Sequence, residues 1–456
     1  MSHKHEESET SLSRFLKRVF GDFNKTKTSY CVFGNYEQLP YFTTNDVDIW
    51  VGNYNVAEKI LLDVVKDQGL RLLLVNKTIS GCNFFLSDSN KKEFIHIDLM
   101  RQIAWRSVVP IFSNEMIKEK ISNYKDICVA GEVLTTVGHL IYPLLTHGVI
   151  KDKYKQKIQS LCVDNAEFKK ILIEILGEAM AVNIIEDGRK SDWKPLINKG
   201  PKLKKLLIIR NLFKRPIKTI RQLIILIASH IYRVFRPSGL CVAFVGNDGC
   251  GKSTIVNELK SMVGNLGVKE NSKSFYWRPF FLPEIKKIIL MDGNKKGKVN
   301  KYTESKKKHS VSISVMKYIY YVIDFVVGGL INRLKIARGG IHLYDRHYDD
   351  LIVYPERFGM TLPKGLANKF RFLVPQPDIV FFLHSRPEVI KKRKDEMYDE
   401  ELDRQIEQYK SLASIYPNYK IINGEASVDV VRDNVVSVIV DCLERKAARA
   451  RYLARR

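Results

Sequence analysis

The stretch FVGNDGCGKST, from Phe244 to Thr254, lies just past the middle of a chain of 456 residues. Within it, Gly246 to Ser253 match the pattern GxxxxGK[ST] without a mismatch. An apolar strand pattern, LCVAFV, comes directly before it, and a helical pattern, TIVNELKSMV, comes directly after it. In that context glycines let backbone N–H groups converge on phosphate oxygens, and the helix N-terminus adds a positive dipole. The sequence therefore predicts a nucleotide-binding loop between a strand and a helix.

The polar residues of this loop have separate chemical roles. The ammonium group of Lys252 would neutralise nucleotide phosphates, and the hydroxyl of Ser253 would bind Mg²⁺. We therefore predict ATP and Mg²⁺ as ligands. Further nucleotide contacts are expected from Gly246, Asn247, Gly249, Cys250, Gly251 and Thr254.

Strand and helix patterns alternate from Leu240 onward, which predicts a parallel sheet covered by helices on both faces. The motif LYDRHYDD ends one of these strands, at the edge where such sheets bind ligands. Asp345 would reach a Mg²⁺-bound water, and Arg346 would bind phosphate oxygens with both arms of its guanidinium. Arg278 and Asp349 are expected to face the same crevice and to contact the second substrate.

FVGNDGCGKST, LYDRHYDD and PDIVFFLHSRPEVIKKRKDEM together resemble the thymidylate kinase family of P-loop kinases, over roughly residues 240–443. The resemblance implies that Asp248 touches the acceptor, that Arg346 organises the donor and acceptor phosphates, and that Arg393 begins a mobile lid. The chain is also similar to thymidylate-kinase-like proteins found with bacterial surface-polysaccharide genes. That similarity implies phosphorylation of a sugar, polyol or nucleotide for the cell envelope. A hydroxyl acceptor would need a general base, either Asp248 or Asp349.

A second set of acidic residues lies in the first half of the chain. In VFGNYEQLPYFTTNDVDIWV, Gly34 and Asn35 follow a strand pattern, and Asp46 and Asp48 alternate along the next one. Asp98, in FIHIDLM, occupies another alternating strand. Three carboxylates at one sheet edge would repel each other unless cations held them, as two Mg²⁺ ions are held for nucleotidyl transfer.

This arrangement resembles the polymerase-β-type nucleotidyltransferase superfamily over about residues 30–101. The resemblance implies a metal site at Asp46, Asp48 and Asp98, and contacts from Gly34 and Asn35 to the nucleotide triphosphate. The chain would then be a bifunctional α/β enzyme, with an α+β nucleotidyltransferase-like domain followed by a P-loop kinase.

We divide the chain into five expected parts, which are a flexible N-terminal segment (1–27), a nucleotidyltransferase-like core (28–113), a helical accessory region (114–200), a basic amphipathic linker helix (201–238) and the kinase domain (239–456). Residues 201–237 contain ten Lys or Arg and no Asp or Glu. Two interpretations of the linker stay open: its apolar side packs on a domain, or it lies on the surface of an anionic membrane.

The net charge of +25 favours anionic partners, and the expected partners are a nucleotide and a small acceptor. Nucleic acid is possible but not favoured as a partner, and the sequence does not indicate the oligomeric state. Seven scattered cysteines, with no signal-peptide or 20-residue apolar pattern, indicate a cytoplasmic protein, with the inner membrane face as a second location. The alternative functions are a dTMP kinase, a nucleotide-gated membrane- or nucleic-acid-binding module, and a defence-type nucleotidyltransferase.

Overall fold

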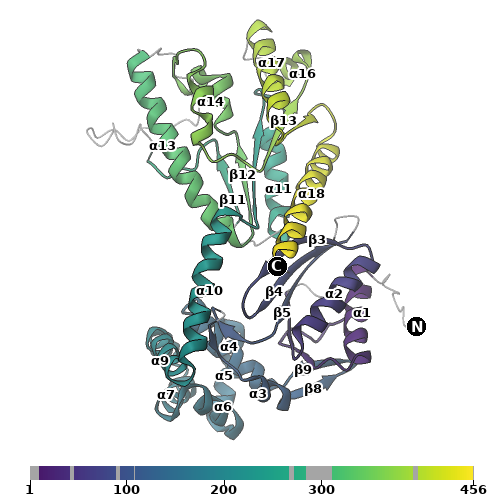
Figure 1. Cartoon of the computed structure of the whole chain (residues 1–456), viewed down its shortest axis with the longest axis vertical. Coiled ribbons are helices and arrows are strands. Elements are labelled where there is room, and N and C mark those ends of the chain that lie inside the picture. Colours follow the sequence, from purple (N-terminus) through teal and green to yellow (C-terminus); the bar gives the residue numbers. More distant parts are fainter. Residues whose placement is uncertain are drawn as a thin grey trace. The chain divides into compact units, whose positions relative to one another are not determined.

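The computed structural model (Figure 1) describes residues 10–41, 46–88, 93–106, 108–266, 272–283, 311–393 and 399–454. The chain divides into two compact units, and the boundary between them, after Tyr232, falls inside the expected linker.

A seven-stranded mixed sheet forms the centre of the first unit, in the order β3-β4-β5-β2-β1-β9-β8. Between residues 28 and 101 the elements are β1 (Tyr30–Val32), β2 (Val47–Val51), α2 (Tyr54–Asp67), β3 (Arg71–Lys77), β4 (Gly81–Ser87) and β5 (Phe94–Met100). The strand patterns expected before Gly34, at Asp48 and at Asp98 correspond to β1, β2 and β5. β2 and β5 are parallel neighbours, and Asp48 is paired in register with Asp98. The pairing brings two of the predicted acids together although 50 positions separate them in sequence.

Two expectations for the first unit are wrong. Residues 1–27 were expected to be flexible, but α1 (Ser11–Lys25) buries one apolar face, including Phe15, Val19 and Phe23. Its apolar residues recur at helical spacing, so the helix is stabilised by packing. Residues 114–200 were expected to be helical throughout, but they include the hairpin β8 (Ile121–Tyr124) and β9 (Ile127–Ala130), whose second strand pairs with β1.

The rest of this region is helical and shares one apolar core. The short hairpin β6 (Ala104–Trp105) and β7 (Val109–Pro110) comes before this region, and the helices of the region are α3 (Asn114–Glu119), α4 (Glu132–Thr146), α5 (Asp152–Asp164), α6 (Ala166–Leu176), α7 (Glu178–Arg189) and α8 (Trp193–Asn198). The expected single linker helix is two helices, α9 (Gly200–Lys214) and α10 (Pro216–Phe235). The break falls before Pro216, which has no N–H to continue α9 but suits the first turn of α10.

The second unit has a parallel five-stranded sheet, in the order β11-β12-β10-β13-β14, with helices on both faces (Figure 1). The fold class predicted from the sequence is therefore confirmed for this unit. The strands are β10 (Leu240–Val245), β11 (Lys273–Tyr276), β12 (Ile341–Asp345), β13 (Ile379–His384) and β14 (Tyr419–Asn423), and the helices are α11 (Lys252–Leu266), α13 (Val311–Lys335), α14 (Asp349–Val353), α15 (Leu366–Lys369), α16 (Pro387–Arg393), α17 (Asp399–Ile415) and α18 (Val428–Ala454).

Helix α13 contains the long apolar stretch of the sequence and is 25 residues long. Among the described residues it is the helix whose length and composition would allow it to cross a membrane. In the second unit it packs Tyr318 and Phe325 into an apolar core beside α14. Its Asp324 is completely buried.

A buried ion pair joins α13 to the segment after β11. Arg278 is 3% exposed, and its Nη1 donates to Asp324 Oδ2 at 3.0 Å. Arg278 also donates to the carbonyl oxygens of Leu282 and Pro283, and Asp324 Oδ1 accepts from Leu282 N–H at 2.6 Å. The guanidinium is therefore occupied by protein partners. Arg278 was expected to bind substrate, but the structure gives it the role of fixing residues 279–283 against α13.

We predict that Arg278→Met lowers the free energy of unfolding of the second unit by about 3 kcal/mol, because it leaves the Asp324 carboxylate buried without its cation. Arg278→Met/Asp324→Leu should recover most of this loss, since neither charge remains buried. Hydrogen exchange at the amides of β10 and β12 measures both effects. The control is Arg432→Ala, which removes an exposed pair with Asp429 and should cost less than about 1 kcal/mol. Equal effects of Arg278→Met and the control would contradict the prediction.

Candidate active site

The loop after β10 has the backbone that a phosphate site requires. Gly246 has φ +137°, and a Cβ atom there would lie 2.8 Å from the carbonyl oxygen of Leu383 on β13. Only glycine fits this position without displacing the backbone. Helix α11 then begins at Lys252, so its free N–H groups and positive dipole end point to the loop. The structure thus confirms the strand, loop and helix order predicted around Gly246 to Thr254.

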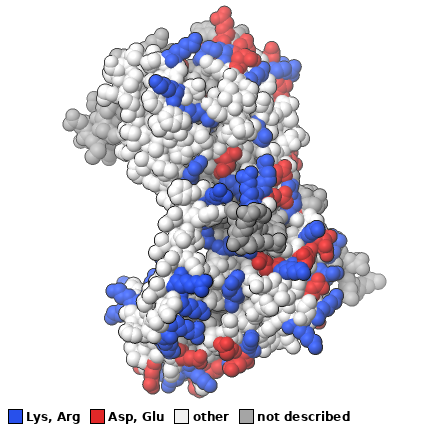
Figure 2. Space-filling view, viewed as in Figure 1, with Lys and Arg blue, Asp and Glu red and all other residues white. Residues whose placement is uncertain are grey.

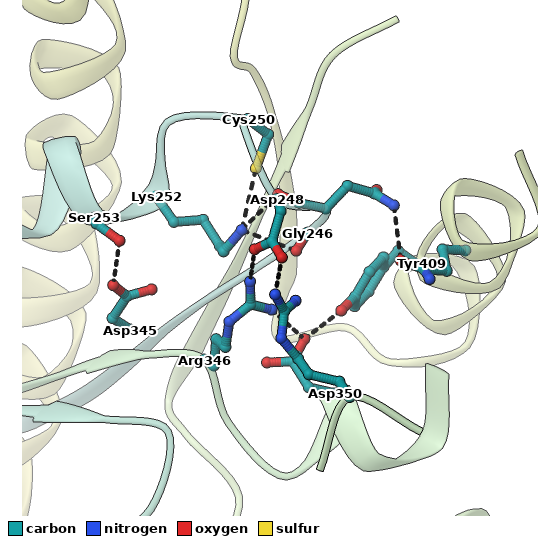
Figure 3. A network of polar contacts seen from close by, with 12 residues as sticks. Gly246, Asp248, Cys250, Lys252, Ser253, Asp345, Arg346, Asp350 and Tyr409 are labelled. Carbon is teal, nitrogen blue, oxygen red and sulfur yellow. Dashed lines mark hydrogen bonds and ion pairs between the residues drawn. The ribbon is translucent and has the colours of Figure 1, made fainter. Parts of the chain in front are cut away.

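Lys252 lies inside the loop. Its ammonium group donates to the carbonyl oxygens of Gly246 at 2.9 Å and Asn247 at 2.6 Å, and lies 3.5 Å from Cys250 Sγ (Figure 3). The side chain is buried, and desolvation lowers its pKa from the ordinary lysine value. Negative charge beside the loop would offset that desolvation, because an anion favours the charged form of lysine.

Ser253 and Asp345 form the second part of the site. The Ser253 hydroxyl donates to Asp345 Oδ2 at 2.6 Å, which joins the first turn of α11 to the end of β12 (Figure 3). Asp345 Oδ1 is buried and has no hydrogen-bond partner among the described residues. A hydroxyl and a carboxylate with a spare oxygen are ligands that Mg²⁺ accepts, directly or through water. These residues therefore fit the predicted Mg²⁺.

Arg346 comes directly after β12, with φ +79°. This backbone conformation is uncommon for a residue with a Cβ and is typical of constrained functional positions. The guanidinium forms an ion pair with Asp248 of the loop, and its Nη1 lies 3.5 Å from Asp350 Oδ1 (Figure 3). Asp248 also pairs with Arg357, which the sequence argument missed. Arg346, at the end of β12, and Arg357 thus both pair with the carboxylate of Asp248 in the loop.

Asp349 does not take part in this convergence. It is buried, and it accepts from Arg371 Nε at 2.7 Å and from the Tyr419 hydroxyl at 2.5 Å. These contacts join α14 to residues before β13 and to β14. Asp349 was expected to bind substrate or to act as a base, but it stabilises the fold behind the site.

A single pocket contains most of the predicted nucleotide contacts. It is lined by residues of the loop and α11 and by residues from six other parts of the unit: Asp248, Gly249, Cys250, Gly251, Lys252, Ser253, Thr254, Ile255, Tyr276, Arg346, Arg357, Leu383, Arg393, Gly424, Ala426, Val428 and Val431. Arg393 Nη1 donates to the Gly424 carbonyl at 3.0 Å, so it lines the pocket as predicted. Its role at the start of a lid stays a prediction, because residues 394–398 lie outside the described residues.

Sequence reasoning missed Tyr276, Arg357 and the segment from Gly424 to Val431. Only the last had a usable signal, the sequence NGEAS after the unrecognised strand β14. Asn247, a predicted nucleotide contact, is buried and donates through Nδ2 to Gln405 Oε1 at 3.0 Å. Its side chain therefore fixes the loop against α17, and its backbone carbonyl holds Lys252.

A second arrangement lies in the first unit, after β1. Gly34 and Asn35 have φ +65° and +48°, which makes a tight turn at the strand end. A Cβ on Gly34 would lie 3.1 Å from His139 Nε2, so the turn approaches α4 closely. His139 stacks on Tyr154 of α5, with ring centroids 3.8 Å apart. The turn thus lies beside the start of α5, where Lys151 and Lys153 occur.

The predicted acids lie at the edge formed by β2 and β5. Burial, with repulsion from Asp98 and Asp46, raises the pKa of Asp48 to about 7. Burial also raises the pKa of Asp98 to about 6. Asp46 instead pairs with His96, whose Nδ1 lies 2.9 Å from Asp46 Oδ1, and this hydrogen bond lowers the pKa of Asp46. His96 Nε2 in turn lies 3.1 Å from Asn83 Nδ2.

Asp48 and Asp98 therefore lie together, while Asp46 is turned to His96. Within the described parts of the chain, no three His, Cys, Asp or Glu side chains are arranged to hold one metal ion. The expected three-carboxylate metal site is thus incomplete in this structure. The physical reason is repulsion: a hydrogen bond to the His96 imidazole stabilises one carboxylate more than a place beside the other two would.

Two curated proteins are similar to part of this chain. The "Probable thymidylate kinase" of Thermococcus kodakarensis is 25% identical over 208 residues, which is 43% of this chain and 96% of that protein. The "Thymidylate kinase" of Prochlorococcus marinus is 24% identical over 218 residues, which is 44% of this chain and 96% of that protein. No protein-family model matches the chain.

Solved thymidylate kinase structures also align with the chain, at low similarity. The enzyme from Ehrlichia chaffeensis has 18% identity and a TM-score of 0.32, and the alignment covers 44% of this chain and 100% of that one. The enzyme from Candida albicans has 17% identity and a TM-score of 0.35, with 45% and 93% covered. The similarity to the two curated proteins covers 43% and 44% of the chain, which is consistent with a P-loop kinase region.

Proposed function

We propose that the second unit is a kinase that transfers a phosphoryl group from ATP to a small acceptor. The observation that carries this proposal is the contact between Ser253 and Asp345 at the N-terminus of α11. It combines an anion-binding helix end with a hydroxyl and a carboxylate suited to Mg²⁺, and Ser253 lines the pocket together with Lys252 and Arg346. The similarity to thymidylate kinases supports the same reaction class.

The residues would act by positioning and by stabilising charge. The loop amides and α11 would hold the terminal phosphates of ATP, and bound Mg²⁺ would neutralise charge on them. The Lys252 ammonium group would move away from the carbonyl oxygens of Gly246 and Asn247. It would then contact the phosphate that is transferred. Arg346, held by Asp248 and Asp350, would stabilise charge between the donor and the acceptor.

The charges in the pocket favour an acceptor that already carries a phosphate. Two guanidinium groups, Arg346 and Arg357, meet at Asp248 in the part of the pocket beyond the loop. Arginine pairs suit phosphate oxygens, and a phosphate acceptor needs no general base. A hydroxyl acceptor would need one, but Asp248 is held by two arginines and Asp349 is buried elsewhere. We therefore propose a nucleoside monophosphate as the acceptor, with dTMP the first compound to test.

The link to cell-envelope polysaccharide stays a prediction. It came from a resemblance of motifs, and neither curated relative carries it in its name. Sugars, sugar phosphates and polyols belong in the acceptor panel because they test that prediction directly. Transfer to one of them in place of dTMP would replace the nucleotide interpretation.

We predict that Lys252→Ala lowers the rate of transfer from γ-labelled ATP about 10³-fold, because it removes the cation at the reacting phosphate. Asp345→Asn should lower the rate about 10²-fold and weaken its dependence on Mg²⁺, because an asparagine side chain carries no charge. Thin-layer chromatography of the acceptor panel measures both rates. The matched control is Lys260→Ala, an exposed lysine on the same helix.

Equal loss in Lys252→Ala and Lys260→Ala would argue against the proposed site. ATP binding by the unmodified chain without transfer to any acceptor would favour the alternative class, a nucleotide-gated binding module.

A second function is favoured by a separate observation in the first unit. Asp48 and Asp98 are in register on neighbouring strands, beside the tight turn at Gly34. We propose that this unit transfers a nucleotidyl group, with Mg²⁺ held by Asp48 and Asp98. Asp46 would join them after leaving His96, since a divalent cation replaces the repulsion between carboxylates with attraction.

Other residues of the first unit would bind the nucleotide. Lys151 is near enough to Asp46 and Asp48 to favour their charged forms. It is the N-cap residue of α5, beside the Gly34 turn, so it would contact a triphosphate bound there together with the N–H groups of Gly34 and Asn35. This fits the predicted contacts of Gly34 and Asn35. The acceptor would be a metabolite, or a macromolecule if the domain serves defence.

We predict that Asp48→Asn lowers transfer of label from an α-labelled nucleoside triphosphate by at least about 10²-fold, because one of the two paired carboxylates is lost. Asp187→Asn is the control, because Asp187 lies in the same unit, in an ion pair with Lys199 outside the site. Lys252→Ala should leave this transfer unchanged.

Label on a small molecule would indicate metabolite synthesis, and label on RNA or protein would indicate the defence-type alternative. A loss of label in Lys252→Ala but not in Asp48→Asn would exclude the first unit as its source.

A further inference from the structure

Helix α10 exposes a narrow row of large aliphatic side chains. Five of them are between 49% and 83% exposed: Ile217, Ile220, Ile224, Ile227 and Ile231. At 3.6 residues per turn they lie within an arc of about 80° and extend for about 21 Å along the helix. We call this set the isoleucine stripe. Isolated exposed apolar residues are common, but a continuous row of this length indicates a surface that contacts something apolar.

The opposite side of α10 is the side that faces the first unit. Leu226 packs against its apolar core, and Gln222 is buried. Thr219 is 1% exposed, and its hydroxyl accepts from Asn211 Nδ2 at 2.9 Å. Asn211 also donates to the Val108 carbonyl. Because these contacts fix the rotation of α10, the isoleucine stripe points away from this unit. On the first unit, α10 therefore packs through Thr219, Gln222 and Leu226 and not through the five isoleucines.

The surroundings of the stripe are strongly basic. Residues 201–237 contain ten Lys or Arg and no acidic residue. Lys218 and Arg221 are exposed on α10, with Arg221 about 40° around the helix from the edge of the stripe and Lys218 further round, and α9 adds further lysines. Figure 2 shows blue Lys and Arg side chains gathered at the lower left of the molecule, in the region of α9 in Figure 1. This surface combines apolar and basic side chains. It is therefore complementary to a partner that has an anionic outer layer over an apolar interior.

We propose that α10 lies in the interface of an anionic lipid membrane, with the isoleucine stripe among the acyl chains and Lys218 and Arg221 at the phosphate groups. Helices with an apolar stripe and basic flanks bind membranes in this way, and long basic side chains extend to the headgroups. Such binding would place the chain at the membrane surface without a span. The inference goes beyond the proposed kinase and nucleotidyltransferase functions.

Lipid fits these observations better than RNA or a second protein chain. RNA would pair with the basic side chains, but its phosphate backbone would leave the five isoleucines exposed to water. A helix partner would cover the isoleucines, but it would have to offset the basic charge on α9 and α10 with acidic side chains. An anionic membrane satisfies both parts of the surface at once.

The test is flotation of the full chain with vesicles of phosphatidylcholine alone, or of phosphatidylcholine mixed with phosphatidylglycerol. We expect binding to the anionic vesicles that weakens as salt is raised, and weak binding to the neutral ones. Ile224→Glu/Ile227→Glu should lower binding to anionic vesicles at least about tenfold, because two charges enter the apolar stripe. Lys218→Glu/Arg221→Glu should lower only the part of the binding that depends on anionic lipid.

Two matched controls separate the stripe from general effects of added charge. Val163→Glu replaces an exposed apolar residue on α5, and Lys169→Glu/Lys170→Glu reverses two exposed charges on α6. Both should bind vesicles as the unmodified chain does, and circular dichroism should show every variant folded. The proposal fails if the unmodified chain does not float with anionic vesicles, or if the controls lose binding as strongly.

Two further outcomes would assign the surface to another partner. Binding to single-stranded RNA without flotation would indicate a nucleic-acid surface. A dimer in analytical ultracentrifugation that Ile224→Glu/Ile227→Glu disrupts, again without flotation, would indicate a second copy of the chain.

Discussion

The proposed kinase site depends on the parallel pairing of β10 with β12, in which Phe244 lies opposite Asp345. Because parallel strands end at the same sheet edge, this register places the loop after β10 beside the acidic end of β12. Ser253 then reaches Asp345, and Asp248 reaches Arg346, although about 90 residues separate the partners. A shift of one residue would point these side chains to the opposite faces of the sheet.

Buried ion pairs hold the two sides of this edge in place. Arg278 with Asp324 fixes the segment after β11, and Arg371 with Asp349 fixes α14 behind the loop. Each charge is removed from water, so its partner has to be present in good geometry. These pairs resemble substrate-binding residues in the sequence, because both kinds of site place Asp and Arg near strand ends. Only the contacts separate the two roles.

In the first unit, a similar pairing creates a site whose charge is unbalanced. Asp48 and Asp98 lie side by side because β2 and β5 are parallel neighbours, and burial and repulsion raise the pKa of both carboxyl groups. Asp46 avoids this repulsion by pairing with His96. The arrangement gives the unit a place where a divalent cation would be stabilised, and it explains why His96, which the motif does not include, contacts the acids.

The elements with a local signal were predictable from the sequence. The loop from Gly246 to Thr254 was predictable because glycine, lysine and serine at fixed spacing have few other uses. Alternating apolar residues marked β5 of the first unit, and continuous apolar runs marked β10, β12 and β13 of the second. Tertiary structure alone decided which charged residues meet. It buried Arg278 and Asp349, brought Arg357 to Asp248, packed α1 into a core and exposed the isoleucine stripe. The reason is physical: spacing along the chain sets the direction of a side chain on its own helix or strand, but burial and charge pairing depend on segments that are distant in sequence.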